Sequence, residues 1–95
     1  MRAAVHRHSG PEAWHTVAGE TCLETPEKTY LGRAGGLPVI VPEGPPMALT
    51  ATGTETRKAV VLILHDSSKR PTTLTSDWEP KGECNKYLNK VTNAP

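Results

Sequence analysis

The chain has 95 residues, enough for one domain with one modest core. Eleven basic and ten acidic side chains give a formal net charge of +1, without a run of like charges that would attract nucleic acid. The longest apolar run covers residues 59–64, far short of the roughly 20 residues needed to cross a bilayer.

The basic residues near Met1 bear on the expected location. Arg2, His6, Arg7 and His8 interrupt any apolar stretch that could serve as a secretory signal. A cytoplasmic location is therefore expected.

Short runs rich in Val, Thr, Ile and Leu alternate with nine prolines and eight glycines, which is typical of an all-β domain. In chain order, extended segments are expected over residues 2–8, 12–18, 20–25, 29–33, 37–41, 47–52 and 57–65. Gly19 could be the turn of a hairpin between the second and third segments. The centre of the last segment, Val60 to Leu64, is apolar on both faces and is expected to lie deepest in the core.

The two cysteines and the polar C-terminal segment allow weaker expectations. Cys22 and Cys84 are compatible with two free thiols or with one bridge closing a long loop, and the free thiols are favoured. Residues 67–95 are expected to pack on the domain at Trp78 and then to fray, with a short helical turn around residues 84–88. Residues 1–66 are expected to hold the β core of this single domain. Glu24, Glu27 and Glu43 are interpreted as turn and surface charges.

The stretch HRHSGPE, residues 6–12, places metal-ligating side chains close together. His6 and His8 are two apart in a strand, so both rings would point to one face. After the turn that follows, Glu12 enters the next strand within reach. Two nitrogens and one carboxylate suit Zn, Fe, Mn or Ni.

The spacing of these residues resembles the first conserved motif of the cupin superfamily. His6-x-His8 is followed after three residues by Glu12 and after six more by Gly19. The beginning of the second cupin motif is matched by Gly36 and, five residues later, by residues 42–44.

The resemblance implies a small cupin-type β-barrel, similar to a jelly roll, over about residues 5–65. It implies a divalent metal held by His6, His8 and Glu12, and a small-molecule ligand in the barrel cavity. Catalysis stays open, because cupins include enzymes and non-catalytic binding proteins. In an enzyme, the metal would act as a Lewis acid or an oxygen activator.

The second motif is incomplete, since Met47 occupies the position of its histidine. Two His and one Glu could still bind a metal with open positions for substrate. The cavity could instead hold an organic ligand without metal, or Met47 or His65 could replace the missing ligand. Trp14 lies on the Glu12 side of its strand and would wall the cavity or, as is favoured, fill the core. His15 should face the opposite side.

The first motif begins close to Met1, so the first strands of the usual barrel have no counterpart here. An open sheet edge would invite another strand to pair with it. The polar segment after Asp66 could fold back over this edge, but a homodimer that pairs or swaps strands is favoured. Because Met47 replaces a metal ligand, the alternative function is a non-catalytic, metal-free module for small-molecule binding or dimerisation.

Overall fold

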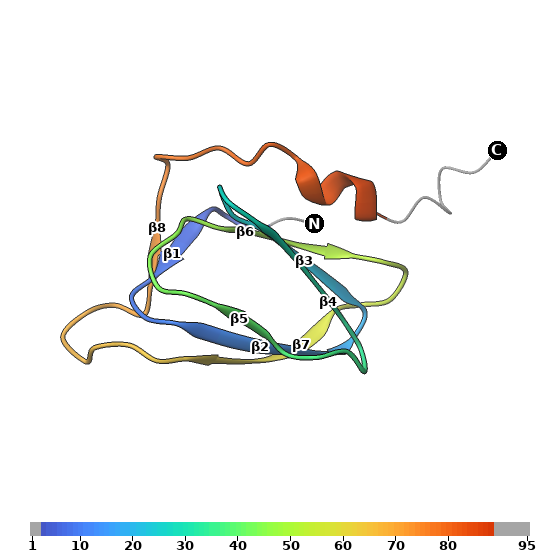
Figure 1. Cartoon of the computed structure of the whole chain (residues 1–95), viewed down its shortest axis with the longest axis horizontal. Helices are drawn as coiled ribbons and strands as arrows, with labels where there is room; N and C mark the ends of the chain where they lie inside the picture. Colours follow the sequence, from blue (N-terminus) through green and yellow to red (C-terminus); the bar gives the residue numbers. More distant parts are fainter. Residues whose placement is uncertain (1–2, 89–95) are drawn as a thin grey trace.

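The computed structural model describes residues 3–88, which form short β-strands and one 3₁₀ helix (Figure 1). The predicted all-β class is confirmed. The elements are β1 (His6–His8), β2 (Glu12–Ala18), β3 (Glu20–Glu24), β4 (Thr29–Arg33), β5 (Val39–Val41), β6 (Ala48–Thr52), β7 (Lys58–Ile63), β8 (Thr72–Leu74) and the 3₁₀ helix η1 (Glu83–Tyr87). None of the described helices is long and apolar enough to span a membrane.

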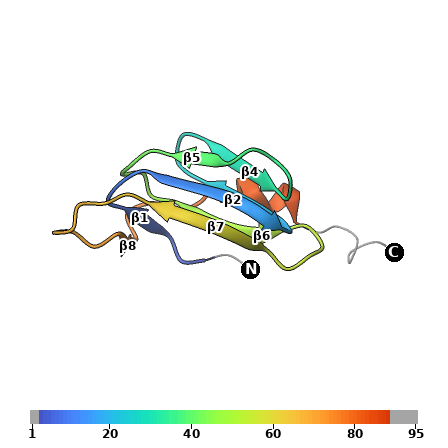
Figure 2. The ribbon, with the colours of Figure 1, turned by 90° about the horizontal axis from the view of Figure 1, so that it is seen from below.

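The strands form three antiparallel sheets, in the orders β5-β2-β7, β4-β3-β6 and β1-β8. The two larger sheets lie on opposite sides of the core, with β1 and β8 at one end (Figures 1 and 2). Within residues 3–88 the sheets do not close into a barrel, so the cupin-type barrel is not seen as such.

The chain crosses from one large sheet to the other at Gly19, and the hairpin expected there is wrong. Strand β2 pairs with β5 and β7, whereas β3 pairs with β4 and β6. Gly19 has a φ of 73°, and a Cβ there would lie 2.9 Å from the Cα of Arg57. A glycine is therefore needed where the chain passes between the sheets.

The core is built from Trp14, Leu23, Val41 and Met47, all at most 1% exposed. Trp14 fills the core, as the sequence favoured. A Cβ on Gly32 of β4 would lie 2.2 Å from Cζ3 of Trp14, so the indole ring lies flush against the bare backbone of that strand. Any side chain at this position would displace the largest residue of the core.

Strand β7 does not lie in the core, and the expectation that it lies deepest is wrong. Val60, Leu62 and Leu64 are 60–66% exposed, and Val61 is 45% exposed. Strand β7 is an edge strand, paired only with β2 among the described strands. No described strand lies beside its outer edge, and its apolar side chains are exposed on the faces of the sheet.

The C-terminal segment is fixed to the sheets more firmly than expected. Strand β8 pairs with β1, and Cys22 of β3 forms a disulfide with Cys84 of η1, so the expectation of free thiols is wrong. The short helical turn expected near Cys84 is confirmed as η1. Trp78 is half-buried, and the expected fraying falls largely on residues outside those described.

A buried carboxylate brings the two cysteines together. Glu24 is 3% exposed, so its interpretation as a surface charge is wrong. Its oxygens accept the backbone N–H groups of Lys81, Gly82 and Glu83 at 2.7–3.2 Å. These three hydrogen bonds compensate the burial of the charge and hold the start of η1 against β3.

Candidate functional sites

The turn between β1 and β2 brings His8 and Glu12 together in the interior. Both are 6% exposed, and Nε2 of His8 lies 3.2 Å from Oε2 of Glu12. The two groups are not aligned as a hydrogen bond, and both Nε2 of His8 and Oε1 of Glu12 are buried without a partner. Buried polar atoms of this kind are uncommon and mark places where an ion, a water molecule or a ligand could bind; Nε1 of Trp14 and Nδ1 of His15 are two more among the described residues.

The other ring nitrogen of His8 is held by the C-terminal segment. Nδ1 lies 3.1 Å from the carbonyl oxygen of Pro71 and 3.0 Å from Oγ1 of Thr72. Since a carbonyl can only accept, Nδ1 carries the proton of this bond. In the neutral ring, the lone pair is then on Nε2, facing Glu12, which is the form that binds metals.

His6 lies beside this pair without joining it. Its ring packs edge-on against the ring of His8, with centroids 4.8 Å apart, and its Nδ1 lies 2.9 Å from the carbonyl oxygen of Ala4. Residues 3–88 contain no group of three or more His, Cys, Asp or Glu side chains arranged to hold a metal ion. The structure thus brings together two of the three expected ligands.

Arg57 is a partly buried cation whose charge interacts with that of Glu12. Its Nε donates to Oγ1 of Thr21 at 2.5 Å. Burial lowers the pKa of Arg57, and the negative charge of Glu12 partly opposes this change. Glu12 therefore has a direct contact with the His8 ring and an electrostatic interaction with Arg57.

The three side chains considered as pocket walls or replacement ligands lie elsewhere. Trp14 and Met47 are enclosed in the core. The backbone of Met47 exchanges two hydrogen bonds with that of His6, so the residue in the second-motif histidine position is a neighbour of the first motif. His65 is exposed, and its ring bonds to carbonyl groups of its own turn, at Asp66 and Lys69. His15 is half-buried on the opposite side of β2 from Glu12, as expected.

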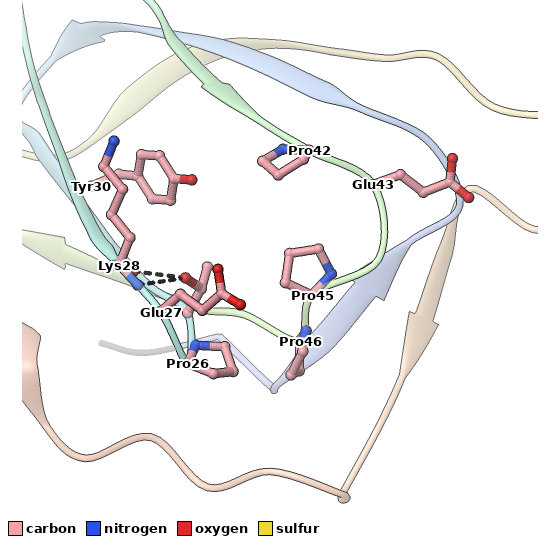
Figure 3. A pocket seen from close by; sticks show the side chains of 9 residues that line it. Pro26, Glu27, Lys28, Tyr30, Pro42, Glu43, Pro45 and Pro46 are labelled. Carbon is pink, nitrogen blue, oxygen red and sulfur yellow. Dashed lines mark hydrogen bonds between the residues drawn. The ribbon is translucent and has the colours of Figure 1, made fainter.

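A separate pocket of about 470 Å³ opens between the β3–β4 turn and the loop after β5 (Figure 3). Its wall contains Tyr30 of β4 and four prolines, and its polar groups come from the two loops. The lining residues are Thr25, Pro26, Glu27, Lys28, Tyr30, Pro42, Glu43, Pro45 and Pro46. Figure 3 shows the Tyr30 ring and Pro42 beside the hollow, with the carboxylate of Glu43 pointing away from it.

The pocket walls are rigid for local reasons. Oγ1 of Thr25 bonds to both the N–H and the carbonyl of Lys28, which fixes the β3–β4 turn. The prolines fix the backbone of the opposite loop. The ammonium group of Lys28 lies 4.9 Å from the centroid of the Tyr30 ring, a cation–π contact that orients both side chains.

The sequence did not predict this pocket. Three prolines are evident in the sequence over residues 42–46, but nothing in the sequence placed that loop opposite Tyr30. That placement follows from β4 and β5 lying at neighbouring edges of the two large sheets.

No protein-family model, curated protein or solved structure matches the chain. The relation to the cupin superfamily therefore stays a prediction from the two motifs.

Proposed function

We propose that the protein is a small-molecule-binding module whose site is the pocket around Tyr30. The observation that carries this proposal is the pocket itself, about 470 Å³ in volume, with rigid walls on both sides. Ligand sites in proteins are typically preformed, largely apolar hollows of this size with a few polar groups at the rim.

The lining indicates the chemistry of the ligand. One face of the Tyr30 ring and the proline rings offer a flat apolar wall, suited to the face of a sugar or an aromatic ring. The ammonium of Lys28 and the carboxylate of Glu27 offer a donor and an acceptor at the rim. A small uncharged molecule with a flat apolar face and several hydrogen-bonding groups fits this lining.

Tyr30→Leu tests the proposal, because it keeps an apolar side chain against the core and removes the aromatic wall. We expect monosaccharides and small aromatic amides, titrated into labelled protein, to shift the backbone amide NMR signals of the non-proline residues at positions 25, 27–30, 43 and 44. Tyr30→Leu should weaken that binding about tenfold, the loss of roughly one stacking contact.

Tyr87→Leu is the matched control, since Tyr87 also lies beneath a lysine, Lys86, but away from the pocket. It should leave binding unchanged. Binding that maps elsewhere, or that survives Tyr30→Leu, would refute the pocket as the site.

A second candidate function is metal binding at His8 and Glu12, which the cupin-like motif implies. It is supported by the unpartnered Nε2 and Oε1 atoms and by the Nδ1–H bond that leaves Nε2 free. These residues suit Zn, Fe, Mn or Ni, with His6, whose ring packs on that of His8, as a further donor. When bound, such an ion would supply a Lewis acid or an oxygen-activating centre.

Metal content per chain tests this second candidate, on protein purified without a metal column. We expect near-stoichiometric metal in the wild type, loss in His8→Ala, and no loss in His65→Ala, which removes an exposed histidine. Added zinc should also raise the melting temperature of the wild type but not of His8→Ala. Wild-type protein that neither carries nor takes up metal would exclude this candidate.

The disulfide bears on location. The cytoplasmic location expected from the sequence is untested, and the Cys22–Cys84 bond weighs against it, because disulfides persist mainly in oxidising compartments. An oxidising compartment is the location that fits this bond.

A further inference from the structure

We infer that two copies of the chain associate through the free edge of β7, pairing antiparallel about a two-fold axis at Leu62. This proposal goes beyond ligand binding and does not depend on it. Strand β7 is exposed, although its apolar composition is typical of a buried strand. Edge strands with long, flat, apolar surfaces are the places where another chain adds to a sheet.

The backbone of β7 has one free side. The N–H of Leu64 donates to the carbonyl of Pro11 at 3.1 Å, on the β2 side. Because successive residues of a strand point their backbone groups to opposite sides, Ala59, Val61 and Ile63 direct theirs away from β2. No other described strand pairs there.

The register about Leu62 is self-complementary. Val61 of one copy lies opposite Ile63 of the other, and each such pair exchanges two backbone hydrogen bonds. Val60 lies opposite Leu64, and the two Leu62 side chains meet on the axis. Aliphatic side chains that are now 45–66% exposed would be partly covered on both faces of the extended sheet.

The charges at the ends of β7 favour a second copy as the occupant. In this register Lys58 lies near the segment that follows β7 in the other copy, which carries Asp66 three residues beyond Ile63, and the same pair recurs at the other end of the interface. Hydrogen bonds from the backbone N–H and the hydroxyl of Ser68 lower the pKa of Asp66, so it is an anion at neutral pH. A parallel arrangement of the two β7 strands would instead place Lys58 beside Lys58 and Asp66 beside Asp66, which is repulsive.

The proposed homodimer uses the edge of β7, whereas the homodimer expected from the sequence uses an open sheet edge near the N-terminus. The open edge expected near the N-terminus belongs to β1, which is paired with β8 of the same chain. Folding back of the C-terminal segment, the route the sequence left as second choice, closes that edge. Among the remaining edges of the described sheets, that of β7 carries the longest run of exposed apolar side chains.

Leu62→Lys tests the interface, because it places two like charges on the axis. Light scattering after size exclusion should show a dimer for the wild type at high concentration and a monomer for Leu62→Lys. Ile40→Lys is the matched control: Ile40 is 63% exposed against 60% for Leu62, and it lies on β5 at the far side of the same sheet. This variant should still dimerise.

A cysteine at position 62 tests the register. In a non-hydrogen-bonded antiparallel pair the two Cβ atoms lie close enough for a disulfide, so Leu62→Cys should form a covalent dimer on oxidation. Ile40→Cys should not. A wild-type protein that is monomeric at every concentration overturns the proposal, as does a dimer that Leu62→Lys leaves intact. Dissociation by Ile40→Lys together with no cross-link at Leu62→Cys would indicate face-to-face packing and also overturn it.

Discussion

Single residues join strands that are distant in the sequence, and Glu20 is the clearest polar example. Its carboxylate accepts a hydrogen bond from Nε of Arg33 at 2.7 Å and from Oγ1 of Thr52 at 2.6 Å. Burial alone would raise the pKa of Glu20, but the hydrogen bonds from Arg33 and Thr52 outweigh it and lower the pKa below 4.5. Glu20 therefore links all three strands of the β4-β3-β6 sheet as an anion.

The lowered pKa of Glu20 determines how its contribution to the free energy of unfolding changes with pH. A carboxyl group whose pKa is lower in the folded state stabilises that state above its unfolded value, and this contribution disappears as the pH falls through the folded value. We expect Glu20→Gln to lower the free energy of unfolding by about 1 kcal/mol or less at pH 7, because solvent screens the exposed Arg33. The difference from wild type should shrink as the pH falls below 4.5.

Urea denaturation at neutral and acidic pH measures this difference. Glu27→Gln, which removes an exposed carboxylate from the β3–β4 turn, should show no comparable dependence. A Glu20→Gln defect that is equally large at pH 3 would contradict the assignment.

For single residues, the sequence predicts on which face of a strand a side chain lies. It does not predict which residue of another strand that side chain contacts. The alternation of β2 placed Trp14 and Glu12 on one face and His15 on the other, as found. The need for glycine at position 32 could not be predicted, because it depends on which strand lies across from Trp14.

At the scale of elements, strand positions were easier to predict than strand partners. The bounds of β2 and β4 match the expected segments, since glycine and proline end strands locally. Pairing depends on distant parts of the chain, which is why the Gly19 hairpin was wrong.

Strand β7 shows a second limit of pattern reading. A strand that is apolar on both faces indicates burial of both faces. The same pattern arises when the burial is supplied by another chain. The sequence alone could not distinguish burial within the chain, which the structure does not show, from the association with a second copy that we propose.

For the whole molecule, the disulfide is the feature with the largest expected effect on stability. Cys22 and Cys84 are 62 residues apart, so their bond closes most of the chain into one loop and restricts the unfolded state. Chain-entropy reasoning gives about 4 kcal/mol for a loop of this length, a large share of the stability of a small domain.

A Cys22→Ser, Cys84→Ser double variant should therefore show a much lower denaturation midpoint in urea than the oxidised wild type. Wild type unfolded and refolded under strong reductant should match the variant. Equal midpoints for the oxidised wild type and the variant would mean that the bond contributes little or does not form.

In the candidate sites too, contacts within a local turn could be predicted from the sequence, and contacts between distant segments could not. The proximity of His8 and Glu12 could be predicted because a tight turn joins them. The pocket at Tyr30 could not, because its walls come from two loops that meet only after the sheets have packed.

The position of the disulfide also determines how the protein would respond to tension applied at its ends. Residues between Cys22 and Cys84 lie inside a covalent loop, so a pulling force bypasses β4 to β8. The force would act on β1 and β2, which precede the loop and are held by pairing with β8, β5 and β7. The first strands to detach would then be those that carry His8, Glu12 and Trp14, while most of the second sheet would stay folded.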